Sequence, residues 1–171
     1  RSRVPDVQFP VACASNLPDV LFTPFLTGLL RGKTPHTGPP VLAHDRTDDV
    51  LAACDVVITA SGTATVQAAL HERPMVVVYK LSPLTYRLGT PFVNVDTYAM
   101  PNLVAGHRVV PELIQSDFTP ERVAEETVLF LNDRERHART REALRRVREK
   151  LGAPGASGRA ADAILAVARS G

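Results

Sequence analysis

A run of apolar, mostly β-branched residues in the middle of the chain, DVVITA at 55–60, constrains the fold more than any other feature. Such a run is typical of a strand that is buried on both faces of a parallel sheet. Ser61-Gly62-Thr63 follows at once, and a helix is expected from there to about Glu72. Pro74 then precedes a second apolar run at 75–79. A strand, a helix and a second strand at this spacing predict a βαβ unit.

The remainder of the first 118 residues repeats this alternation. Further strands are expected at 7–14 and 41–44, and helices at 17–30 and 46–54. Because crossover connections between parallel strands are right-handed, this order predicts an α/β fold with a Rossmann-like parallel sheet flanked by helices. Ligands of such sheets bind at the carboxyl ends of the strands.

From Thr119 onward the pattern is helical throughout. Thr119 is suited to an N-cap, and Pro120 fits the first position of a helix. Two further helices are expected, at 133–151 and 159–168. The sequence therefore predicts two parts: a Rossmann-like domain at 1–118, partial at its N-terminus, and a helical segment at 119–171 that packs on it.

The composition excludes several classes of protein. Twenty Lys and Arg residues stand against 18 Asp and Glu residues, and this net charge of +2 argues against a dedicated nucleic-acid binder. The two cysteines, Cys13 and Cys54, cannot form a disulfide-rich scaffold and have no metal-ligand spacing. The five histidines are scattered, so no metal site is expected. No apolar run is long enough for a membrane span.

The loop Ser61-Gly62-Thr63 is the strongest candidate for a binding site. It lies where a strand gives way to a helix, so free backbone N–H groups and the helix dipole favour an anion there. Gly62 allows close approach, and the two hydroxyl groups add donors, which together suit a phosphate or diphosphate. Gln67 lies one helical turn later and could bind a ribose hydroxyl group. The alternative is an ordinary capped turn with a solvated glutamine.

Other polar residues are weaker candidates. Lys80 ends a strand at the ligand-binding edge, where it either neutralises phosphate or is simply solvated. Asn102 lies in an apolar stretch and needs partners, either backbone groups or a ligand. Glu112 and Gln115 are one helical turn apart and by themselves resemble an ordinary polar helix face. No nucleophile elbow and no catalytic dyad is found in the sequence.

A basic segment occupies 134–150, with eight Lys or Arg residues and three Glu residues. One interpretation is a solvated helix with ion pairs along it. The other is attraction to anionic lipid head groups.

Four ordered motifs resemble those of the lipid-A-disaccharide synthase family, in the glycosyltransferase B superfamily. They are ASGTATVQAAL (60–70), RPMVVVYKLSPLTY (73–86), MPNLVAG (100–106) and VVPELIQ (109–115), and GASGRAADAIL (155–165) in the helical tail also fits. The resemblance implies two Rossmann-like domains facing a cleft. It also implies transfer of 2,3-diacylglucosamine from its UDP derivative to 2,3-diacylglucosamine 1-phosphate (lipid X), without a metal or other cofactor, on the cytoplasmic face of the bacterial inner membrane.

The resemblance also assigns roles to single residues. Ser61, Gly62 and Thr63 would hold the UDP end of the donor, and Asn102 would line the donor site. Glu112 and Gln115 match a further motif and are weaker candidates. The family usually has Glu where this chain has Gln67, which keeps one acceptor oxygen and adds donors.

Members of the family are longer than this chain, which is similar only to most of their C-terminal, donor-binding half. The general base is expected in the N-terminal half, so no catalytic base is assigned, and the chain alone is expected to be inactive. Three alternatives remain at this point. They are another UDP-sugar glycosyltransferase or epimerase, a non-catalytic UDP-binding module, and a structural domain in which residues 61–63 only cap a helix.

Overall fold

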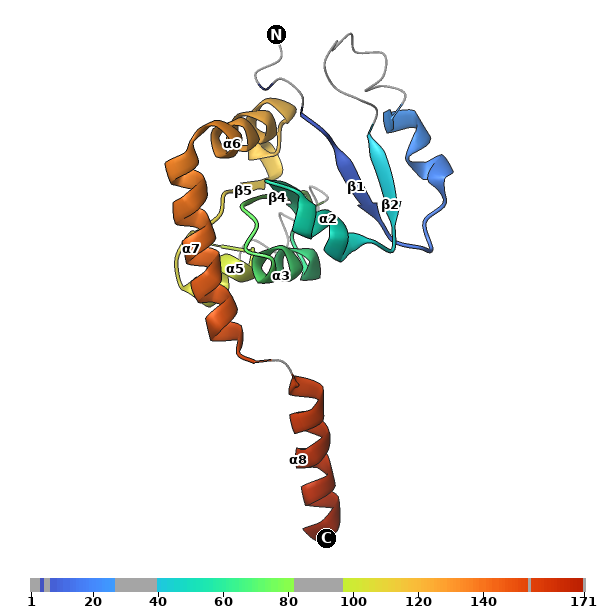
Figure 1. Cartoon of the computed structure of the whole chain (residues 1–171), viewed down its shortest axis with the longest axis vertical. Coiled ribbons are helices and arrows are strands. Elements are labelled where there is room, and N and C mark those ends of the chain that lie inside the picture. The colour runs from blue at the N-terminus through green and yellow to red at the C-terminus, as the bar shows by residue number, and fades with distance from the viewer. Residues whose placement is uncertain (1–3, 5–6, 27–39, 82–96, 154, 171) are drawn as a thin grey trace.

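The computed structural model describes residues 4, 7–26, 40–81, 97–153 and 155–170 (Figure 1). The strands are β1 (Pro10–Cys13), β2 (Val41–His44), β3 (Val57–Ala60), β4 (Met75–Tyr79) and β5 (Glu112–Ile114). The α-helices are α2 (Thr47–Ala53), α3 (Thr63–Leu70), α5 (Met100–Ala105), α6 (Pro120–Asn132), α7 (Arg134–Leu151) and α8 (Ala156–Ser170). Two short 3-10 helices are η1 (Asp19–Leu21) and η3 (Gln115–Asp117). Most of the helix expected at 17–30 is replaced by η1 and a helical stretch at 23–26, and residues 27–30 lie outside the described part.

All strand pairs of the described chain are parallel, and helices alternate with the strands. The predicted α/β class with a Rossmann-like parallel arrangement is therefore confirmed. The strands form two sheets, ordered β1-β2 and β3-β4-β5. Among the described residues, no strand pairs with both sheets.

This arrangement corrects the prediction that residues 55–60 form a strand buried on both faces. Within the described chain, β3 pairs only with β4, and its residues alternate between half-buried and exposed. Ile58 keeps 48% of its surface exposed. The strand with the expected burial is β4, whose Met75 and Val76 are fully buried. Composition alone did not distinguish the two, because both strands are rich in β-branched residues.

The two faces of β4 belong to two apolar clusters. Met75 and Val77 pack with buried residues of α2, α3 and α7, whereas Val76 packs with Leu113 of β5 and Phe130 of α6. This is the period-2 alternation of a strand covered by helices on both sides. Each fully buried side chain of this size contributes about 1.5–3 kcal/mol to the free energy of folding.

The helical tail begins as the sequence predicts. The Thr119 hydroxyl accepts a hydrogen bond from the Arg122 N–H at 3.2 Å, and Pro120 is the first residue of α6. Asp133 caps α7 in the same way, accepting from the Arg136 N–H at 2.9 Å. Both α6 and α7 contact the first part of the chain, on β4 and on α3 and α5 respectively. By contrast, α8 extends away from the rest of the molecule, and its residues 156–169 are exposed (Figure 1). The division at residue 118 remains a prediction.

Candidate functional site

The loop Ser61-Gly62-Thr63 leaves the sheet at the carboxyl end of β3 and starts α3. The Ser61 N–H still donates to the Val78 carbonyl at 3.2 Å, so the sheet pairing continues up to this residue. Gly62 then adopts φ +148°, a conformation that side chains rarely allow. A Cβ atom at Gly62 would meet nothing within 4 Å, so the space over the loop is open.

Gly62 occupies the N-cap position of α3 and has no side chain that could cap the helix. Within the described part of the chain, the Ser61 and Thr63 hydroxyl groups make no capping hydrogen bond either. The Thr65 hydroxyl instead donates to the Gly62 carbonyl at 2.6 Å, from a fully buried position. The Thr65 N–H also donates to the Gly62 carbonyl, at 3.0 Å. The N–H groups of Thr63 and Ala64 are therefore the ones left without an acceptor among the described residues, which suits an anion. Sequence reasoning missed Thr65, because nothing in the motif separates it from its neighbours.

Ser61 links this loop to the segment before α5. Its hydroxyl donates to the Tyr98 carbonyl at 3.0 Å, across 37 residues of sequence. Ser61 can still accept a hydrogen bond from a ligand, but its proton is directed at the protein. No sequence signal pointed to Tyr98, because it takes part through its backbone.

Thr63 and Gln67 lie one turn apart on α3, as predicted. Thr63 is exposed and Gln67 is half-buried. Lys80 follows the last residue of β4 and is exposed. It therefore lies after a strand that is the direct neighbour of β3, at the same edge of the sheet as the Ser61 loop.

Asn102, the candidate on α5, lies inside the protein with 1% of its surface exposed. Its Oδ1 accepts from the Val109 N–H at 2.7 Å and from the Val110 N–H at 3.0 Å. Its Nδ2 donates to the Val110 carbonyl at 2.9 Å and to Glu112 Oε1 at 2.6 Å. These four bonds use the full hydrogen-bonding capacity of the amide. In this arrangement the side chain holds the 109–110 segment against α5.

Glu112 is the second buried polar residue of this region, with 9% of its surface exposed. Because Glu112 pairs in register with Val77, its side chain lies on the same side of the sheet as the Val77 side chain. Oε2 accepts from the Tyr98 N–H at 2.8 Å, and Oε1 accepts from the Ala99 N–H at 3.1 Å. The carboxylate thereby satisfies backbone donors at the start of α5, where the helix dipole favours a negative charge.

Gln115 pairs with backbone groups rather than pointing into open space. Its Oε1 accepts from the Leu81 N–H at 2.6 Å, and its Nε2 donates to the Leu81 carbonyl at 3.3 Å. These two bonds extend the pairing of β4 and β5 beyond the last residue of each strand. They fix the backbone directly after Lys80.

The structure thus sorts the predicted residues into two groups. Five of them lie at or near the carboxyl ends of β3 and β4: Ser61, Gly62, Thr63, Gln67 and Lys80. The side chains of the other three form hydrogen bonds with other groups of the protein: Asn102, Glu112 and Gln115. The two groups are joined by a continuous path from Ser61 through Tyr98 to Glu112 and Asn102. Whether a ligand touches any of these residues remains a prediction.

Cys54 is a half-buried thiol directly after α2. Burial raises its pKa above the ordinary value, and the nearby positive charge of Arg73 lowers it by less. A raised pKa keeps the thiol protonated near neutral pH, which is unfavourable for a nucleophile or a metal ligand. Among the described residues, no group of three His, Cys, Asp or Glu residues could hold a metal ion. No helix in that part of the chain combines the length and the apolar character that crossing a membrane requires.

Comparison with known proteins identifies the family. The family model for lipid-A-disaccharide synthetase matches residues 36–167. A lipid-A-disaccharide synthase of Geobacter metallireducens is 44% identical over 167 residues, which is 96% of this chain and 41% of the relative. One of Nitrosococcus oceani is 39% identical over 152 residues, 89% of this chain and 38% of the relative. One of Anaeromyxobacter dehalogenans (strain 2CP-1) is 41% identical over 170 residues, 99% of this chain and 43% of the relative.

These matches run through nearly the whole chain, and they include the loop at 61–63 and the segments that carry Asn102 and Glu112. The chain spans less than half the length of the curated relatives that it matches. On the family match and on the identity shared with these relatives, the chain belongs to the lipid-A-disaccharide synthase family.

Proposed function

We propose that this chain supplies the UDP-sugar-binding part of a lipid-A-disaccharide synthase. The complete reaction would transfer 2,3-diacylglucosamine from UDP-2,3-diacylglucosamine to lipid X, giving lipid A disaccharide 1-phosphate and UDP. The chemistry would be inverting glycosyl transfer, in which the 6-hydroxyl group of the acceptor attacks the anomeric carbon. The observation that carries the proposal is the uncapped N-terminus of α3 beneath the open space at Gly62, in a chain of this family.

In this proposal the diphosphate of UDP lies over the loop at 61–63. The N–H groups of α3 would donate to its oxygens, and the dipole of α3 would offset part of its charge. Lys80, which follows the neighbouring strand β4 at the same edge of the sheet, would add a positive charge, and Gln67 would bind the ribose. As the glycosidic bond breaks, negative charge grows on the departing UDP, and these donors stabilise it without rearranging.

Asn102 and Glu112 have a different role in the proposal. Their hydrogen bonds fix the start of α5 and the Tyr98 backbone, and the Tyr98 carbonyl in turn accepts from Ser61. They would thereby position the loop that holds UDP. The general base would come from the part of the relatives that this chain does not cover, so the chain alone should show no transferase activity.

The proposed substrates are lipids, so we also propose peripheral contact with an anionic membrane, at the cytoplasmic face of the bacterial inner membrane. Supporting this are the eight basic residues of the segment at 134–150, most of which lie on the exposed sides of α7.

Calorimetric titration of the chain with UDP tests the donor site. We expect UDP to bind, and Lys80→Gln to weaken binding by about three- to tenfold, because a charge-assisted contact contributes about 1 kcal/mol. Arg141→Gln removes the same charge from an exposed position on α7 and should leave UDP affinity unchanged. A folded chain that binds no UDP would contradict the proposal.

One observation favours a second function, a UDP-binding module without catalysis. It is Gln67, which stands where the family usually has Glu. Transferase assays of a longer protein that includes this chain distinguish the two, since the module would bind UDP but form no disaccharide.

A further inference from the structure

A pocket of about 380 Å³ lies between the C-terminal end of α5 and one face of α7, away from the loop at 61–63. Its apolar lining comes from Ala105, Ala143 and Val147. Its polar lining comes from His107, Arg139, Glu142, Arg146 and Lys150. The α7 members recur at three- and four-residue steps, so they share one side of that helix.

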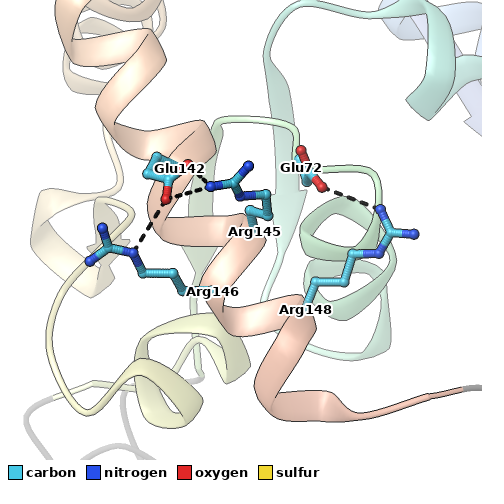
Figure 2. A network of polar contacts seen from close by, with 5 residues as sticks. All are labelled: Glu72, Glu142, Arg145, Arg146 and Arg148. Atoms are coloured by element: carbon cyan, nitrogen blue, oxygen red, sulfur yellow. Dashed lines mark hydrogen bonds and ion pairs between the residues drawn. The ribbon is translucent and has the colours of Figure 1, made fainter.

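The basic residues of α7 divide between two sides of the helix. Figure 2 shows Arg148 reaching one way, to Glu72 at 3.2 Å, while Arg146 reaches the other way, on the pocket side. Glu142 is shared: it bonds Arg145 at 2.8 Å and Arg146 at 3.4 Å. The longer contact leaves Arg146 less well neutralised than Arg145.

The pocket carries an excess of positive charge. Three permanent cations, Arg139, Arg146 and Lys150, face one carboxylate, Glu142, which leaves +2. Lys150 donates to the carbonyl oxygens of Val104 and Ala105, at 3.3 Å each, so its partners there are neutral groups. Arg139 pairs with Glu135, an exposed contact one turn earlier on α7.

The two arginines can turn toward a ligand at low cost. The Arg139 side chain is 65% exposed and the Arg146 side chain is 73% exposed. Ion pairs this exposed contribute little to stability, so a phosphate anion can replace their partners. A guanidinium group can donate two parallel hydrogen bonds to a phosphate group.

We propose that this pocket binds a phosphate group esterified to a small apolar or polyol unit. The phosphate would lie between Arg139, Arg146 and Lys150, and the attached unit would contact Ala143 and Val147. A lipid head group and a soluble phosphate share this chemistry. The inference that a lipid supplies the phosphate rests on the membrane contact proposed above. The inference that the pocket binds phosphate does not depend on that contact.

Two measurements on the whole chain test the inference. The first is co-sedimentation with vesicles of phosphatidylglycerol or of phosphatidylcholine. The second is a titration with inorganic phosphate, in which NMR monitors the chemical shifts of the backbone amides. A titration with sodium chloride at equal ionic strength is the reference. The variants are Arg146→Gln, in the pocket, and Arg141→Gln, an exposed residue of the same helix outside it. Both remove one charge, so diffuse attraction would change equally in the two.

We expect Arg146→Gln to weaken binding to phosphatidylglycerol vesicles about fivefold, because the variant loses a charge-assisted contact with the phosphate. Arg141→Gln should change this binding less than about twofold. Phosphate should shift the Ala143 and Val147 amides in the original chain and not in Arg146→Gln. Phosphate shifts without vesicle binding would support the pocket with a soluble ligand and overturn the membrane contact. Equal weakening in both variants, or no phosphate-specific shift, would overturn the pocket. UDP calorimetry is independent of every one of these results.

Discussion

The side chains of Asn102 and Glu112 meet inside the protein, where Asn102 Nδ2 donates to Glu112 Oε1 at 2.6 Å. Asn102 holds the segment at 109–110, and Glu112 accepts from the backbone N–H groups of Tyr98 and Ala99, directly before α5. Both side chains are almost fully buried, so water cannot replace a lost partner. Two residues that are ten positions apart in the sequence therefore form one buried polar contact, here called the Asn102–Glu112 clamp, which holds residues 98–99 and 109–110 in place.

Glu112→Gln should destabilise the fold. Three donors converge on the carboxylate, from Tyr98, Ala99 and Asn102. A glutamine offers one oxygen, so its amide nitrogen must face at least one of these donors. The buried mismatch should lower the free energy of unfolding by about 1–3 kcal/mol, measured by urea denaturation.

The matched control for this variant is Glu125→Gln on α6. Glu125 is exposed, so this control should change stability by less than about 0.5 kcal/mol. Equal stability of Glu112→Gln and the original chain would show that the carboxylate is not needed for the clamp.

Asn102→Asp tests the same contact with nearly unchanged shape. The substitution places a carboxylate oxygen where Nδ2 now donates to Glu112, so two negative charges would face each other at short distance. The variant should be destabilised at pH 7 by about 3 kcal/mol or more. Protonation of either carboxyl group removes the repulsion, so the deficit relative to the original chain should shrink as the pH falls toward 4. Asn16→Asp, at an exposed turn, should show neither effect; a deficit at Asn102 that is independent of pH would contradict the contact.

Cys54 should react slowly with iodoacetamide. Burial raises its pKa, so less thiolate is present at a given pH than for a free cysteine. In a Cys13→Ser variant, which leaves Cys54 as the one thiol, the midpoint of the pH–rate profile should lie above the ordinary thiol value. Unfolding in urea should return the midpoint to that value. A midpoint at or below it in the folded chain would refute the shift.

Local signals made a large part of the fold predictable. Thr119-Pro120 and Asp133 specify helix starts through their own side chains, and the structure has caps at both places. The alternation of apolar runs with turn residues predicted β1, β2, β3 and β4, but it did not predict β5. Residues 112 and 115 were expected on a polar helix face, whereas Glu112 lies in a buried strand and Gln115 follows that strand. The features that were predicted depend on neighbours in sequence, so the sequence alone contains them.

Features that depend on distant neighbours were not predictable. The exposure of Ile58 depends on which strands lie beside β3, and nothing within DVVITA encodes that. The inward direction of the Asn102 amide depends on the backbone at 109–110, which folds back against α5. The Ser61 contact with the Tyr98 carbonyl joins segments 37 residues apart. The sequence therefore marked polar residues near the sheet edge but could not say which of them face a ligand.

Gln67→Glu should strengthen UDP binding. Gln67 is half-buried on α3 one turn after Thr63, and the resemblance of the motif at 60–70 implies a carboxylate at this position in the family pattern. A carboxylate accepts from both ribose hydroxyl groups, whereas the glutamine amide has a single acceptor oxygen. We expect the dissociation constant measured by calorimetry to fall about three- to tenfold, as for one further charge-assisted hydrogen bond. UMP should show the same gain, because it keeps the ribose, and inorganic diphosphate should show none. Weaker UDP binding by the variant would mean that the new carboxylate lies close to the diphosphate and repels it. Residue 67 would then not contact the ribose.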